Sequence, residues 1–157
     1  MLDRLNVILL DVDGCILPNT RNSEDDFIIF GINLKNLKEL CLSSNLKIVI
    51  ISSMSSRMVY HKGRIKREDI NIFCPHDDRA IAMMSTYISD VTIDVAKGNK
   101  ESTIKRYISD NDIGKVIVLD DTNFSHNVNH NNGSYYVPMN GYLSGKDISI
   151  INKIISK

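Results

Sequence analysis

Two aspartates at the end of an apolar segment are the residues of this sequence best suited to chemistry. Asp11 and Asp13 directly follow the apolar run Val7–Leu10, and Gly14 comes next. Glycine adopts backbone angles that other residues avoid, so the chain can turn here. Two carboxylates this close repel each other when both are ionised, and a bound cation or one retained proton relieves the repulsion. The segment therefore predicts either a Mg²⁺ site with acid–base chemistry or, more simply, an ordinary polar turn.

A second acidic pair ends another apolar segment. Asp120 and Asp121 follow Val116–Leu119, as the first pair follows its own run. Short apolar runs rich in β-branched residues are typical of buried strands. Two strands that each end in carboxylates are hard to explain as turns alone. If the two strands are neighbours, their acids can converge on one metal.

Two further positions have side chains that could contact a phosphoryl group. Ser52 follows the strand expected over Lys47–Ile51, and either presents its hydroxyl beside Asp11 or caps a following helix. Lys97 and Lys100 stand where a new helix is expected to open. A lysine has the unfavourable sign at that end of a helix dipole, so its position has another cause, either function or solvent exposure.

The segment 55–69 is rich in basic residues and is expected to be helical. Arg57, Lys62 and Arg64 are its candidate contacts to an extended anionic substrate, the alternative being a solvated face. His126 and His130 have the spacing of a helical metal pair, but no third zinc ligand is apparent.

The remaining patterns predict alternating strands and helices, hence an α/β fold with a parallel sheet. A loop with one hairpin is expected over Cys15–Gly31, before a helix capped by Asn33. The other expected strands are 70–73, 91–95 and 134–137. Helices are expected after Pro75, from about residue 97, and after a capping box at Ser144–Asp147.

The bulk composition indicates an ordinary globular protein. The 157 residues fit one domain, 1–157, with 43% hydrophobic and 24% charged residues. Basic and acidic residues balance at 19 each, so no global charge indicates nucleic acid or a membrane. Three widely spaced cysteines give no disulfide framework. No signal peptide or membrane span is expected, and we predict a cytoplasmic protein.

In order and spacing, these motifs resemble the haloacid dehalogenase superfamily of phosphatases. The Asp-Val-Asp-Gly at 11–14, the strand ending in Ser52, the lysine at 97 or 100 and the acids at 120–121 match its four motifs. The resemblance implies a three-layer, Rossmann-like parallel sheet with helices on both faces. The intervals between motifs leave no room for a cap domain.

The resemblance also implies roles for the matching residues. Asp11 would be the nucleophile that forms an aspartyl-phosphate, and Asp13 the general acid and base. Asp11, Asp13 (through its carbonyl) and Asp120 would hold Mg²⁺, with Asp121 beside the metal.

Ser52 and one lysine would bind the phosphoryl oxygens. Lys97 belongs to a Lys-Gly dipeptide common in the superfamily, whereas Lys100 has Ile104 and Tyr107 at the usual offsets. Lys100 is slightly favoured.

Three functions are compatible with these features. The first is a Mg²⁺-dependent phosphomonoesterase for nucleic-acid ends or nucleotides, because the chain resembles small capless modules of phage and bacterial nucleic-acid-repair proteins. The second is a small-metabolite phosphatase of the sugar-acid type, whose site a neighbour in a homo-oligomer covers. The third is a non-catalytic phosphate-binding module, which would not need the second acid Asp13.

Overall fold

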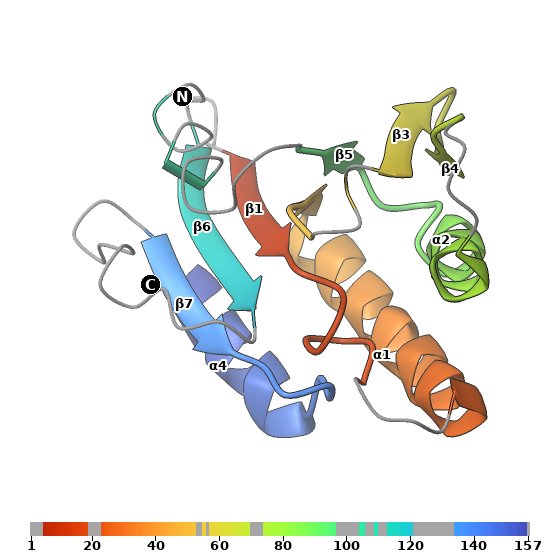
Figure 1. Cartoon of the computed structure of the whole chain (residues 1–157). Helices are drawn as coiled ribbons and strands as arrows, with labels where there is room; N and C mark the ends of the chain where they lie inside the picture. Colours follow the sequence, from red (N-terminus) through yellow and green to blue (C-terminus); the bar gives the residue numbers. More distant parts are fainter. Residues whose placement is uncertain are drawn as a thin grey trace.

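The computed structural model describes residues 5–18, 23–52, 55, 57–69, 74–96, 104–105, 109, 113–120 and 134–156. Five of its strands are parallel: β1 (Leu5–Leu10), β2 (Leu46–Ile50), β5 (Ile93–Val95), β6 (Ile113–Asp120) and β7 (Ser134–Pro138). They form one sheet in the order β5-β2-β1-β6-β7 (Figure 1). All five carboxyl ends therefore lie at one edge of the sheet.

The strand β1 is the centre of the sheet because both of its faces are apolar. Leu10 is in register with Ile50 of β2 and with Leu119 of β6. Side chains alternate along a strand, so Ile8 packs into one core cluster and Val7 into the other, and both are fully buried. This double burial explains why β1 reads as a continuous apolar run rather than an alternating one.

Helices cover the sheet. Three of them pack into the larger core cluster: α1 (Ser23–Ser44), α2 (Pro75–Tyr87) and α4 (Gly145–Ile155). On the other face, Ile104 packs against β-strand residues such as Val49 and Val118, and its backbone is helical. The predicted three-layer α/β architecture is confirmed. Within the described ranges no cap domain covers the sheet.

The first helix corrects one prediction. Helix α1 begins at Ser23, so residues 23–31 are helical instead of belonging to the expected loop and hairpin, and Asn33 is not an N-cap. Phe27, Phe30 and Leu34 face the core, but Ile28 and Ile32 are 60% and 54% exposed. These exposed isoleucines hid the helical period, because they put apolar residues on the solvent side as well.

The helix predicted over 55–69 is also wrong. The chain there forms an antiparallel hairpin of β3 (Met58–His61) and β4 (Arg64–Arg67). Lys62 and Gly63 make its turn with φ of 52° and 80°. Two consecutive residues with positive φ are the feature of the tight turns that match the twist of paired strands.

Other predicted elements are confirmed. Helix α2 starts at Pro75, β5 occupies part of 91–95, and Ser144 and Asp147 form the capping box of α4. The expected strand at 70–73 and the start of the helix near residue 97 lie outside the described residues. No helix in the described part of the chain is long and apolar enough to cross a membrane.

Candidate active site at the carboxyl edge of the sheet

Asp11 and Asp120 lie at the ends of two neighbouring strands. The main-chain N–H of Asp11 donates to the carbonyl of Leu119 at 3.0 Å, which extends the β1–β6 ladder up to the two acids. Both side chains are buried, with 2% and 0% exposed. The strand order reverses at β1, where sheets of this type bind ligands. The structure therefore brings the first acid of each predicted pair to the same place.

Ser52 lies on the other side of Asp11. The N–H of Ile51 donates to the carbonyl of Leu10 at 2.8 Å, so the β1–β2 pairing continues to the residue before Ser52. The serine is 2% exposed, and its carbonyl accepts from the N–H of Ser55 at 2.8 Å. The α-helix expected after it is absent, because residues 58–67 form a hairpin. Ser52 and Asp120 flank the strand that carries Asp11.

Asp13 occupies a different environment from Asp11, although one residue separates them. It sits in a tight turn in which the N–H of Leu17 donates to the carbonyl of Val12 at 3.0 Å. Gly14 has a φ of 74°, a conformation that favours glycine. Asp13 is half-buried, whereas Asp11 is buried. The turn thus gives the second acid access to solvent that the first one lacks.

Asn33 is a site residue that the sequence analysis missed. Its side-chain amide donates to the carbonyls of Ile16 at 2.6 Å and Gly141 at 2.9 Å, and its oxygen accepts from the N–H of Leu143 at 3.0 Å. These bonds tie the turn that follows Asp13 to the segment between β7 and α4. The only signal in the sequence is a polar residue at a core-facing helical position, three residues after Phe30.

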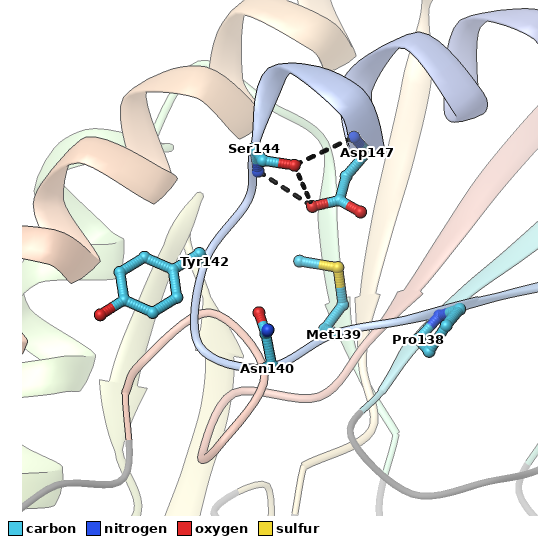
Figure 2. A pocket seen from close by; sticks show the side chains of 6 residues that line it. All are labelled: Pro138, Met139, Asn140, Tyr142, Ser144 and Asp147. Atoms are coloured by element: carbon cyan, nitrogen blue, oxygen red, sulfur yellow. Dashed lines mark hydrogen bonds between the residues drawn. The ribbon is translucent and has the colours of Figure 1, made fainter.

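A shallow hollow lies beside this segment, beyond the end of β7. It is lined by Pro138, Met139, Asn140, Tyr142, Ser144 and Asp147 (Figure 2). Ser144 and Asp147 hydrogen-bond to each other there in the capping box of α4. Their polar groups are thus already used in the helix start. The hollow contains none of the predicted site residues, although the segment that lines it also contacts the turn after β1, where the N–H of Gly141 donates to the carbonyl of Cys15 at 2.8 Å.

The basic residues of the predicted substrate patch have different environments. Arg57 forms an ion pair with the buried Asp77 of α2. Lys62 and Arg64 are exposed at the end of the β3–β4 hairpin. Of the other predicted site residues, Lys97, Lys100 and Asp121 lie outside the described ranges, as do the two histidines of the zinc alternative, at 126 and 130.

The described residues are compatible with Mg²⁺ without forming a complete metal site. Among them, no group of three or more His, Cys, Asp or Glu is placed to hold a metal ion. Magnesium, however, is usually held by one or two carboxylates, together with water and substrate phosphate oxygens. Asp11 and Asp120 supply two buried carboxylates from adjacent strands. A donor set made up only of oxygen atoms fits magnesium and does not fit a soft metal.

The fold and this edge of acids and hydroxyl are those of the haloacid dehalogenase (HAD) superfamily. The model of a family described as the HAD domain in Swiss Army Knife RNA repair proteins matches residues 7–143, and the chain belongs to this family. Membership implies activity of the phosphatase or hydrolase type in general terms. No match was found among curated proteins or solved structures.

Proposed function

We propose that this protein is a Mg²⁺-dependent phosphomonoesterase that removes terminal phosphates from RNA through an aspartyl-phosphate intermediate. The observation that carries the proposal is the placement of Asp11. Its buried carboxylate ends the central strand, with Ser52 and Asp120 on the two neighbouring strands. The half-buried Asp13 lies two residues further along the same turn.

The two acids at 11 and 13 divide the chemistry. The carboxylate of Asp11 attacks phosphorus, a P–O bond forms, and the bond to the leaving oxygen breaks. Asp13 gives its proton to that oxygen. In the second step Asp13 takes a proton from water, which attacks the phosphoryl group, releases inorganic phosphate and restores Asp11. Asp13 must reach both the leaving group and water, which agrees with its greater exposure.

The remaining groups position the phosphate. The hydroxyl of Ser52 and the ammonium of Lys100, or of Lys97, would bind its oxygens and stabilise charge in the transition state. Asp11, the carbonyl of Asp13, and Asp120, with Asp121 beside them, would hold Mg²⁺. When bound, the ion offsets the negative charge of the carboxylates and the phosphate.

The RNA end as substrate is supported by the family description and by the open edge of the sheet. The matching family is described by its occurrence in RNA repair proteins. The described edge carries no cap domain, so a polymer can reach the acids. Small-metabolite phosphatases of this type, in contrast, need a neighbouring subunit to cover the site. A monomeric mass in solution is therefore expected.

The test is hydrolysis by Asp11→Asn. The substitution keeps the size of the side chain and removes its nucleophilic charge, so we expect loss of turnover of an aryl phosphate and of RNA 3′- and 5′-phosphates. The circular dichroism spectrum should remain unchanged. Asp90→Asn is the matched control, because Asp90 forms an exposed ion pair with Lys38 and should be dispensable. Retained Mg²⁺-dependent turnover in Asp11→Asn would disprove the nucleophile.

A further inference from the structure

The β3–β4 hairpin has one apolar face and one basic face. Residues directly opposite each other in a hairpin share a face, so Met58 and Arg67 lie with Tyr60 and Ile65. Met58 and Ile65 are buried at 0% and 3% exposure, and the hydroxyl of Ser85 in α2 donates to the carbonyl of Ile65. Met58 and Ile65 therefore pack this face against the protein, whereas Tyr60 on the same face is 42% exposed.

The opposite face is exposed and positive. His61 pairs with Arg64 and Val59 with Lys66, and Lys62 is in the turn between the strands. We call His61, Lys62, Arg64 and Lys66 the basic face; all four are exposed. No acid occurs in 58–67, although the whole chain has a net charge of zero. The acids that follow, Glu68 and Asp69, lie after the last paired residue.

Two arginines of this segment are held in ion pairs with described acids, and the residues of the basic face are not. Arg57 pairs with Asp77 and Arg67 with Asp78, and both acids belong to the first turn of α2. None of the residues of the basic face forms an ion pair with any described acid. Helix α2 thus neutralises the arginines at the base of the hairpin and leaves its outer charges available to an anion.

The base of the hairpin is joined to the carboxyl edge of the sheet by a short stretch of chain. Met58 follows Ser52 after five intervening residues, so the hairpin leaves the sheet from its carboxyl edge. Strand β3 contacts β5, and Figure 1 shows the two strands beside each other. Only β2 separates β5 from β1, and neighbouring strands are about 4.8 Å apart, so β5 is about 10 Å from the strand of Asp11.

We propose that the basic face binds the phosphodiester backbone of single-stranded RNA whose phosphorylated end enters the carboxyl edge of the sheet. This inference rests on the proposed function for the identity of the polymer. Repeated phosphates match a row of exposed cations, and such contacts supply affinity without reading sequence. A polymer between hairpin and active site need extend past only two strands of the sheet.

The test measures binding apart from catalysis. A fluorescent single-stranded RNA of about 12 nucleotides without terminal phosphate is titrated by anisotropy at about 50 mM and about 200 mM salt. The variant Lys62→Gln/Arg64→Gln/Lys66→Gln removes three charges and little volume. Lys35→Gln/Lys105→Gln/Lys153→Gln removes the same charge from exposed positions elsewhere and is the control.

Three phosphate contacts to a single strand contribute about 2 to the slope of log K against log salt, or a roughly 20-fold affinity change across this salt range. We expect the salt slope of the hairpin variant to fall by this amount and the salt slope of the control variant to stay as in the parent. Turnover of an aryl phosphate should be unchanged in both variants, because the hairpin does not contact so small a substrate.

The outcomes separate this inference from the proposed function. If the parent hydrolyses aryl phosphate but its RNA affinity is the same in the hairpin variant, the basic face is not the RNA surface. Tighter binding of a polyglutamate peptide or of single-stranded DNA than of RNA would also overturn it. If RNA binding depends on the hairpin but no phosphomonoester is hydrolysed, the binding surface stands and the phosphatase proposal fails.

Discussion

The side chain of Asn33 donates a hydrogen bond to the main-chain carbonyl of Gly141, 108 residues later in the chain, at 2.9 Å. The same amide group also bonds to Ile16, and its oxygen accepts from Leu143. Asn33 is 3% exposed, so these bonds form away from water. One residue of α1 therefore fixes the relative position of two loops at the carboxyl edge of the sheet.

Replacing Asn33 with alanine should destabilise the protein. The change leaves three buried main-chain groups without a partner, and each such group costs about 1–3 kcal/mol. Because the surroundings relax in part, we expect a loss of about 2–4 kcal/mol in the free energy of unfolding, measured in urea. Asn36→Ala, one turn further along α1, should change stability by less than about 0.5 kcal/mol.

Asn33→Asp gives a sharper test of the same contact. The aspartate keeps the oxygen that accepts from Leu143 but replaces the donor that serves Ile16 and Gly141. It should therefore be no more stable than Asn33→Ala. If the Asn33 variants, folded at low temperature, hydrolyse an aryl phosphate like the parent, the hydrogen bonds of Asn33 do not position Asp13.

Gly141→Ala should disturb the same junction. Gly141 has a φ of 97°, and a Cβ there would lie 3.1 Å from the backbone Cα of Pro18. We expect a loss of about 2–3 kcal/mol in unfolding free energy. Gly63→Ala, at a φ of 80° in open space, should cost only about 1 kcal/mol. Gly145→Ala has neither constraint and should be neutral or stabilising, so an equal effect of all three would contradict this account.

Asp13→Asn should slow hydrolysis by about 10²–10⁴-fold, the usual contribution of a general acid or base. With an aryl phosphate, the good leaving group needs little protonation, so attack by Asp11 should be less affected than the attack of water. The phosphorylated enzyme should then accumulate and appear in intact-mass spectra as the addition of one phosphoryl group. A variant as active as the parent would show that Asp13 is not the acid and base.

Metal removal should abolish turnover, and Mg²⁺ should restore it. Because Asp120 is one of two buried carboxylates on adjacent strands, Asp120→Asn should need at least about tenfold more Mg²⁺ for half-maximal activity, equivalent to about 1.4 kcal/mol. A second readout needs no catalysis: Mg²⁺ should raise the melting temperature of the parent protein through binding to the folded state. If Mg²⁺ raised the melting temperature of Asp120→Asn by the same amount, the ion would not be bound by Asp120.

The three cysteines should differ in reactivity. Burial raises the pKa of the Cys41 thiol from its usual 9.0 to about 12. Cys15 is also buried, whereas Cys74 is partly exposed before α2. A disulfide reagent at about pH 8 should therefore label Cys74 first. Fast labelling of Cys41 in the folded protein would contradict its burial.

The raised pKa of Cys41 also has a consequence for stability. The thiolate forms more readily in the unfolded chain than in the folded one. Below about pH 9 the thiol is neutral in both states, and its contribution to the stability of the folded state is fully present. This contribution should fall as the pH rises from about 9 toward 12. Cys41→Ser titrates in neither state and should lack this part of the alkaline decline in the melting temperature.

The sequence by itself determined the sheet and most of the candidate catalytic residues. The last residues of β1, β2 and β6 are buried on both faces, so 7–10, 48–51 and 116–119 are uninterrupted apolar runs, each followed by a polar residue of the site. Asp11, Ser52 and Asp120 could therefore be chosen by local pattern alone. Crossover rules then predicted that parallel strands would place these ends at one edge.

Only the tertiary structure decided which residues support that edge and which charges remain available. Asn33 looked like a helix cap, and its role depends on loops that are distant in sequence. The segment 55–69 looked like a basic helix, but a turn with positive φ and the acids of α2 made it a hairpin with one neutralised end. Both outcomes result from long-range contacts, which no local periodicity records.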